Sequence, residues 1–99
     1  MSVLNLDLRD GFKHDDVIVY ADEREAARAS DLTTDLTISH AASLQLAVPD
    51  GLFKLRLDVP RQGISASVSV DVAETPYVAV FILDGEPSFH KAKEPMPML

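Results

Sequence analysis

The chain has 99 residues, a formal net charge of −7 at pH 7 and no cysteine. Its length suits one domain rather than two, and a hydrophobic content of 46% is above the range of disordered chains. The lack of cysteine excludes thiol catalysis and cysteine-based zinc sites. Because the charge is strongly acidic and the lysines and arginines are scattered, nucleic acid and anionic membrane surfaces are not expected as partners.

No part of the sequence indicates a membrane segment or a secretion signal. No stretch approaches the ~20 consecutive apolar residues that a membrane-spanning helix needs. Residues 1–7 lack the basic start and the long apolar run of a signal peptide. We therefore expect a cytoplasmic location and no membrane partner.

The first quarter of the chain predicts two strands. Residues 3–8 alternate, with leucines on one side, which is typical of a half-buried strand. Residues 9–11 form a turn signal, and Phe12 is expected to enter the core from the loop that follows. Residues 17–21 are β-branched and apolar on both faces, which indicates a strand in a central position.

Residues 22–31 admit two interpretations. Asp22 and Glu25 have the spacing of a capping box, and the helix formers that follow allow a helix of two turns. Such a short helix is marginal when its only apolar residues are alanines. We therefore prefer a tight turn at residues 22–24 and a short edge strand over residues 26–29. Residues 32–38 alternate in part and are expected to form another strand.

The most regular part of the chain is the stretch from Ser43 to Leu83. It contains runs at residues 43–48, 53–59 and 64–72, each with alternating apolar residues, separated by proline and glycine turn signals. Residues 77–83 are apolar throughout, which predicts a strand covered on both faces. The alternating residues expected to face the core are Leu44, Leu46, Val48, Phe53, Leu55, Leu57, Val59, Ile64, Ala66, Val68, Val70 and Val72.

The end of the chain predicts an edge strand and then a tail. Residues 88–91 fit a last short strand, and the prolines of residues 93–99 predict a flexible or extended tail rich in proline and methionine. Short strands at regular spacing with turns between them favour an antiparallel β-sandwich. The sequence therefore predicts one domain over residues 1–92, an all-β antiparallel sandwich of seven or eight strands with little or no helix.

Two runs of the sequence resemble the prealbumin-like (transthyretin-like) sandwiches, which include carboxypeptidase-regulatory-like and PEGA-type modules. Residues 17–22 (Val-Ile-Val-Tyr-Ala-Asp) resemble their first central strand and turn, and residues 48–57 (Val-Pro-Asp-Gly-Leu-Phe-Lys-Leu-Arg-Leu) resemble one of their hairpins. The resemblance implies a seven-stranded sandwich that serves as an accessory or binding module. One branch hydrolyses 5-hydroxyisourate and ends in Tyr-Arg-Gly-Ser, whereas this sequence ends in Pro97-Met98-Leu99. The resemblance therefore implies no catalytic residue here.

The densest polar cluster is His14-Asp15-Asp16. Oxygen ligands of this kind suit Ca²⁺, but the ordered aspartate loop of a calcium site is missing. We expect a solvated acidic loop and no metal or cofactor. His14, His40 and His90 do not share metal-ligand spacing and are expected to be exposed in or beside loops.

Serines are plentiful, but no nucleophile elbow surrounds any of them, and no enzyme is expected. Ser65, Ser67 and Ser69 alternate with core residues and predict a smooth outer face on one strand. Small side chains on an edge strand favour pairing with another strand. These serines are the candidate interaction face.

The predicted function is a non-catalytic module acting through protein–protein interaction or self-association, with a protein partner or a homo-oligomer. The alternative is binding of a small ligand or carbohydrate at the loop end.

Overall fold

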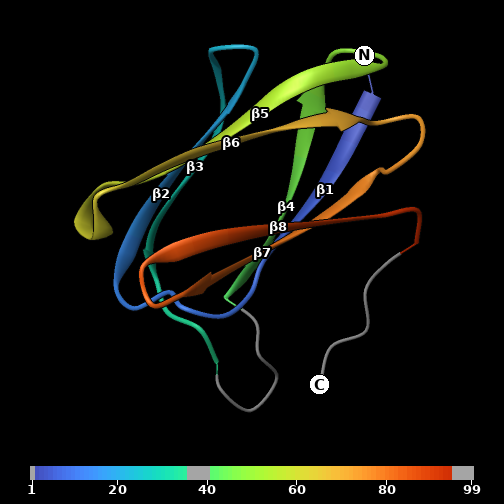
Figure 1. Ribbon diagram of the computed structural model, residues 1–99. Coiled ribbons are helices and arrows are strands. Elements are labelled where there is room, and N and C mark those ends of the chain that lie inside the picture. The colour runs from blue at the N-terminus through green and yellow to red at the C-terminus, as the bar shows by residue number, and fades with distance from the viewer. Residues whose placement is uncertain (1, 36–40, 95–99) are drawn as a thin grey trace.

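Two four-stranded sheets pack face to face in the computed structural model, which describes residues 2–35 and 41–94 (Figure 1). The strand orders are β4-β1-β7-β8 in the first sheet and β3-β2-β5-β6 in the second. The strands are β1 (Ser2–Leu8), β2 (Asp15–Ala21), β3 (Arg24–Leu32), β4 (Ala42–Val48), β5 (Leu52–Val59), β6 (Ile64–Asp71), β7 (Tyr77–Leu83) and β8 (Glu86–Ala92). The prediction of an all-β sandwich is confirmed.

The core lies between the two sheets and follows the alternation of the sequence. The β1 leucines are fully buried, and Leu55 and Leu57 of β5 are each 1% exposed. Phe12 enters the same core from the loop after β1, as predicted. Each fully buried side chain of this size contributes roughly 1.5–3 kcal/mol through removal of apolar surface from water. The sandwich is therefore held together by the inward residues of every strand rather than by one dominant element.

Strand β7 is covered on both faces, as its unbroken apolar run predicts. Three successive residues, Val78, Ala79 and Val80, are buried. Because neighbouring residues of a strand point to opposite faces, burial of all three requires cover on both sides. Within the sheet, β7 has a neighbouring strand on each side, β1 and β8.

One strand pair departs from the predicted antiparallel arrangement. β1 and β7 are parallel, with Asn5 opposite Tyr77 and Leu8 opposite Val80, whereas the other paired strands run antiparallel. The expectation of a wholly antiparallel sandwich is thus wrong for this pair. Parallel neighbours need a long crossover connection, and here the whole second sheet and β4 lie between the two strands in the sequence.

The ambiguous segment after β2 is a strand, not a helix. Asp22 and Glu23 have φ values of 49° and 67°, and positive φ at both central residues is the geometry of a tight hairpin turn. β3 then runs for nine residues, longer than the predicted 26–29. The strand expected over residues 32–38 is wrong for Thr33 and Thr34, which follow the end of β3. Residues 36–38 lie outside the described residues.

The connection from β5 to β6 is short. A single turn of 3₁₀ helix, η1 (Pro60–Gln62), joins β5 to β6. β8 is the predicted last edge strand and is longer than residues 88–91. Of the tail predicted over residues 93–99, the last five residues lie outside the described part. Within residues 2–35 and 41–94, no helix is long and apolar enough to cross a membrane.

Candidate functional site

Strand β6 forms one edge of the second sheet and carries the predicted serine face. It pairs with β5 without a bulge, from Leu52 opposite Asp71 to Val59 opposite Ile64. Ser65, Ser67 and Ser69 are all exposed. The structure therefore places the three serines together on the outer side of a regular edge strand.

The backbone of β6 shows which of its polar groups point away from the sheet. The N–H of Val72, just after the strand, donates to the carbonyl of Gly51 on the β5 side. The carbonyl of Ser69 points the other way, because it accepts a hydrogen bond from Nζ of Lys91 at 3.1 Å. In an antiparallel pair, alternate residues direct both backbone groups toward the partner strand or both away. Ser65, Ser67 and Ser69 therefore present their N–H and C=O groups outward.

A ladder of charged residues on β5 lies beside the serines. Lys54, Arg56 and Asp58 are opposite Ser69, Ser67 and Ser65, in that order. The Ser65 hydroxyl donates to Oδ1 of Asp58 at 2.8 Å. The alternation of apolar and charged residues along 53–59 places these three side chains on the outer face, but it does not show which serine lies opposite each of them.

Glu23, in the turn between β2 and β3, pairs with two residues of the ladder. Nζ of Lys54 donates to its Oε1 at 2.9 Å, and Nη1 of Arg56 donates to its Oε2 at 2.6 Å. The hydrogen bond from Lys54 and the charge of Arg56 hold the pKa of Glu23 below its ordinary value. The Arg56 guanidinium also lies 4.1 Å from the centre of the Tyr20 ring. Glu23 thus pairs with two charges of the ladder, whereas Nε of Arg56 lies 3.4 Å from Oδ1 of Asp58 and is buried without a hydrogen bond to any described residue.

The predicted acidic loop is not wholly solvated. His14 and Asp16 are exposed, but Asp15 is only 2% exposed. Oδ2 of Asp15 accepts hydrogen bonds from the N–H of Lys13 at 2.8 Å and from Nε2 of Gln62 at 2.7 Å. The expectation of a solvated Asp15 is therefore wrong, because its carboxylate joins the start of β2 to η1.

The other members of the acidic cluster also bond within the protein. Nδ1 of His14 lies 2.8 Å from Oδ1 of Asp31, and both side chains are exposed. Oδ1 of Asp16 accepts from the N–H of Asp31 at 3.2 Å. In the described parts of the chain, no three histidine, aspartate or glutamate residues are grouped so that they could hold a metal ion. His90 is exposed on β8, and His40 lies outside the described residues.

Thr34 fixes the loop next to this cluster. It is 7% exposed, and its hydroxyl donates to the carbonyl of Arg9 at 2.5 Å and accepts from the N–H of Phe12 at 3.1 Å. The backbone N–H of Thr34 donates to the carbonyl of Phe12. These bonds attach the segment after β3 to the loop that carries the Phe12 anchor.

Replacement of Thr34 with valine is expected to destabilise the protein by about 1–3 kcal/mol, because the buried N–H of Phe12 loses its acceptor. Chemical denaturation of the purified protein measures this change. Thr34→Ser keeps the hydroxyl and is the matched control, with an expected loss below that of valine. Equal stability of the valine variant and the wild type would contradict the assigned role of the hydroxyl.

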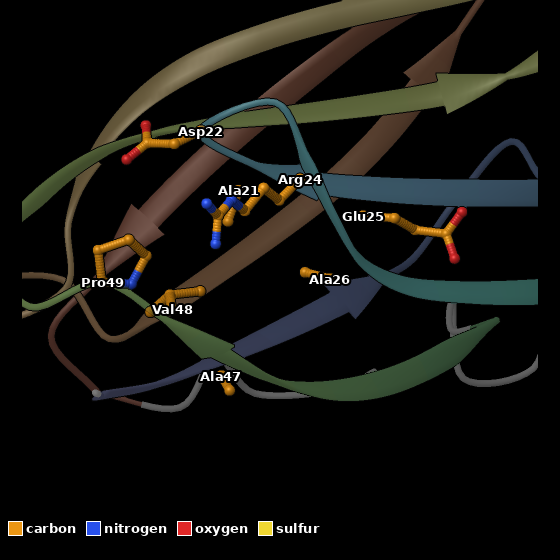
Figure 2. A pocket seen from close by; sticks show the side chains of 8 residues that line it. All are labelled: Ala21, Asp22, Arg24, Glu25, Ala26, Ala47, Val48 and Pro49. Carbon is orange, nitrogen blue, oxygen red and sulfur yellow. The ribbon is translucent and has the colours of Figure 1, made fainter.

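A groove lies on the opposite edge of the second sheet, between the start of β3 and the end of β4 (Figure 2). It has a volume of about 540 Å³. Arg24 and Ala26 line it from β3, and Val48 and Pro49 line it from the end of β4. The sequence interpretation missed it, because both alternatives for residues 22–31, the preferred turn and the helix, leave the neighbour of Arg24 on β4 unknown.

Comparison of the chain with protein-family models, with curated proteins and with solved structures finds no match. A fold alone does not define a function, because one architecture serves many activities. The function has to be argued from the β6 edge, the acidic cluster and the groove themselves.

Proposed function

We propose that the chain is a non-catalytic module that acts by self-association, and that β6 of one copy pairs with β6 of a second copy. The observation that carries this proposal is the outward direction of the backbone groups of Ser65, Ser67 and Ser69. An edge strand with unpaired N–H and C=O groups is a template for the addition of another strand. The partner in this proposal is a protein of the same kind, not nucleic acid or a membrane.

The two edges of the second sheet differ in how they are protected. Natural edge strands avoid pairing through bulges, prolines and charged side chains. β3 has register irregularities in its pairing with β2 and carries Arg24 and Arg28. β6 pairs regularly, and its residues 64–70 contain neither proline nor charge. This contrast supports β6 as the edge that takes a partner.

The sequence of β6 also fits a two-fold symmetric pair. Antiparallel pairing centred on Ser67 sets Ser65 of one copy opposite Ser69 of the other, and Asp71 opposite Gly63. No acidic residue then faces an acidic residue directly, so the repulsion between like charges in opposite positions is avoided. Lys91 has to release the Ser69 carbonyl, which then accepts from the second copy.

The prealbumin-like resemblance is part of this proposal. Residues 17–21 lie in the central strand β2, and residues 48–57 run from the end of β4 through the turn into β5. The described strands number eight, one more than the resemblance implies. A module of that group acts through its surface, in agreement with association through β6.

The test is Ser67→Pro, studied by sedimentation velocity over a series of protein concentrations. The N–H of Ser67 points away from β5, so proline removes a donor for the second copy and leaves the β5 ladder intact. We expect the dimer dissociation constant to rise at least about tenfold, which corresponds to roughly 1.4 kcal/mol. The unfolding midpoint of the monomer should change little.

Ala66→Pro is the matched control on the same strand. The N–H of Ala66 points toward β5, and proline at this position removes a hydrogen bond of the β5–β6 ladder. This variant is therefore expected to lose stability rather than association alone. A wild-type protein that sediments as a monomer at every concentration would overturn the proposal, and so would a Ser67→Pro variant that associates as the wild type does.

A further inference from the structure

The groove between β3 and β4 has the size and apolar lining of a small-molecule site. Ligand pockets in proteins typically have volumes of about 300–1,000 Å³, and this groove has about 540 Å³. Ala21, Ala26, Val48 and Pro49 supply its apolar lining. Figure 2 shows these side chains around the opening between the β2–β3 turn and the end of β4.

The acidic residues at the groove already have partners. Oδ1 of Asp22 accepts from the N–H of Lys54 at 2.8 Å. Oε1 of Glu25 accepts from Nη2 of Arg28 at 2.6 Å. Asp22 is thus held by a backbone group and Glu25 is paired with the charge of Arg28, and neither Lys54 nor Arg28 lines the groove.

Arg24 is different, because its side chain makes no hydrogen bond or ion pair with any residue in the described ranges 2–35 and 41–94. It is paired across the sheet with Ala21, whose side chain is buried on the inner face. Residues opposite each other on neighbouring strands share a face of the sheet. Arg24 therefore lies on the inner side at the open end of the sandwich, and in Figure 2 its guanidinium points toward Val48 and Pro49.

We infer that the groove binds a small molecule with an apolar body and one carboxylate, and that Arg24 binds the carboxylate. A guanidinium offers two parallel N–H donors that match the two oxygens of a carboxylate. Of the net charge of −7, the part that lies more than about 8 Å away is screened at physiological salt, and the two carboxylates at the groove are bonded to the backbone of Lys54 and to Arg28. The site lies on the opposite edge of the sheet from β6 and is independent of self-association.

The probes are 4-phenylbutyrate and 4-phenylbutanamide, which share a shape and differ in charge. Titration of the ¹⁵N-labelled full chain with the acid should shift the amide signals of Ala21, Ala26 and Val48 to a plateau. The uncharged amide should bind at least about tenfold more weakly, as should the acid to Arg24→Gln. Because Arg24 is exposed, its replacement should leave a dispersed spectrum of a folded protein.

Arg61→Gln is the control, because Arg61 is an exposed arginine in η1, away from the groove. It should bind the acid as the wild type does, and Arg24→Lys should retain part of the affinity. Equal binding of the acid and the amide would overturn the inference, as would signal shifts that avoid the groove or that persist unchanged in Arg24→Gln. The inference also fails if the Arg24→Gln variant associates more strongly than the wild type while its binding of the acid is unchanged. That result would mean that Arg24 protects the β3 edge from pairing with another strand, as an inward-pointing charge can. None of these outcomes depends on the Ser67→Pro result.

Discussion

Gly11→Ala is expected to lower the free energy of unfolding by roughly 2–5 kcal/mol, through overpacking and backbone strain together. Gly11 has a φ of +95°, and a Cβ atom there would meet the backbone oxygen of Ile82 and lie 2.6 Å from its Cβ. The close approach arises because the loop after β1 runs beside β7, where the N–H of Ile82 donates to the carbonyl of Asp10. A backbone shift that relieves the contact would lengthen or bend this hydrogen bond.

Gly63→Ala is the control for Gly11→Ala. Gly63 also has a positive φ, 68°, but a Cβ atom at this position would have no neighbour within 4 Å. Its replacement should cost only the left-handed backbone penalty, about 1–2 kcal/mol. Urea denaturation of both variants measures the difference, and equal losses at the two glycines would show that contact with Ile82 is not the cause.

Leu57→Ala is expected to cost about 2–5 kcal/mol, from the lost burial and the cavity that remains. Leu57 is 1% exposed and lies in β5, which is central in the second sheet. A domain of this size has a total stability of roughly 5–15 kcal/mol. This one replacement therefore removes a large fraction of the stability, and the variant is expected to melt well below the wild type.

Leu52→Ala tests whether burial rather than residue type is responsible. Leu52 belongs to the same strand but is 71% exposed. A surface change of this kind is usually within about 0.5 kcal/mol of neutral. Thermal unfolding of the pair should separate the two variants clearly, and a similar loss at both positions would contradict the assignment of Leu57 to the core.

The position of each strand could be predicted because it depends on local sequence. The alternation of apolar and polar residues predicted which side chains of β1, β5 and β6 face the core. The unbroken apolar run of β7 predicted a strand that is covered on both faces. The partners of the strands depend on contacts between distant segments, and local alternation carries no information about strand direction. The parallel pairing of β1 with β7 was missed for this reason.

Polar residues were predicted less well than apolar ones. Asp15 was expected in solvent because carboxylates are rarely buried without partners, and its partners, Lys13 and Gln62, come from the preceding residues and a distant turn. The inward direction of Arg24 follows from its register with Ala21, which requires the hairpin to be known. The serines of β6 were placed correctly because they alternate with core residues on one regular strand.

The parallel pair in the first sheet has a consequence for synthesis on the ribosome. Asn5 contacts Pro76, 71 positions further along the chain, so β1 has no partner on its β7 side until those 71 residues have been made. At typical translation rates this delay lasts about 4–15 s. Contacts of such high sequence separation also make folding slow, since a long loop has to close before they form. The β7 side of β1 therefore stays without its strand partner throughout this interval.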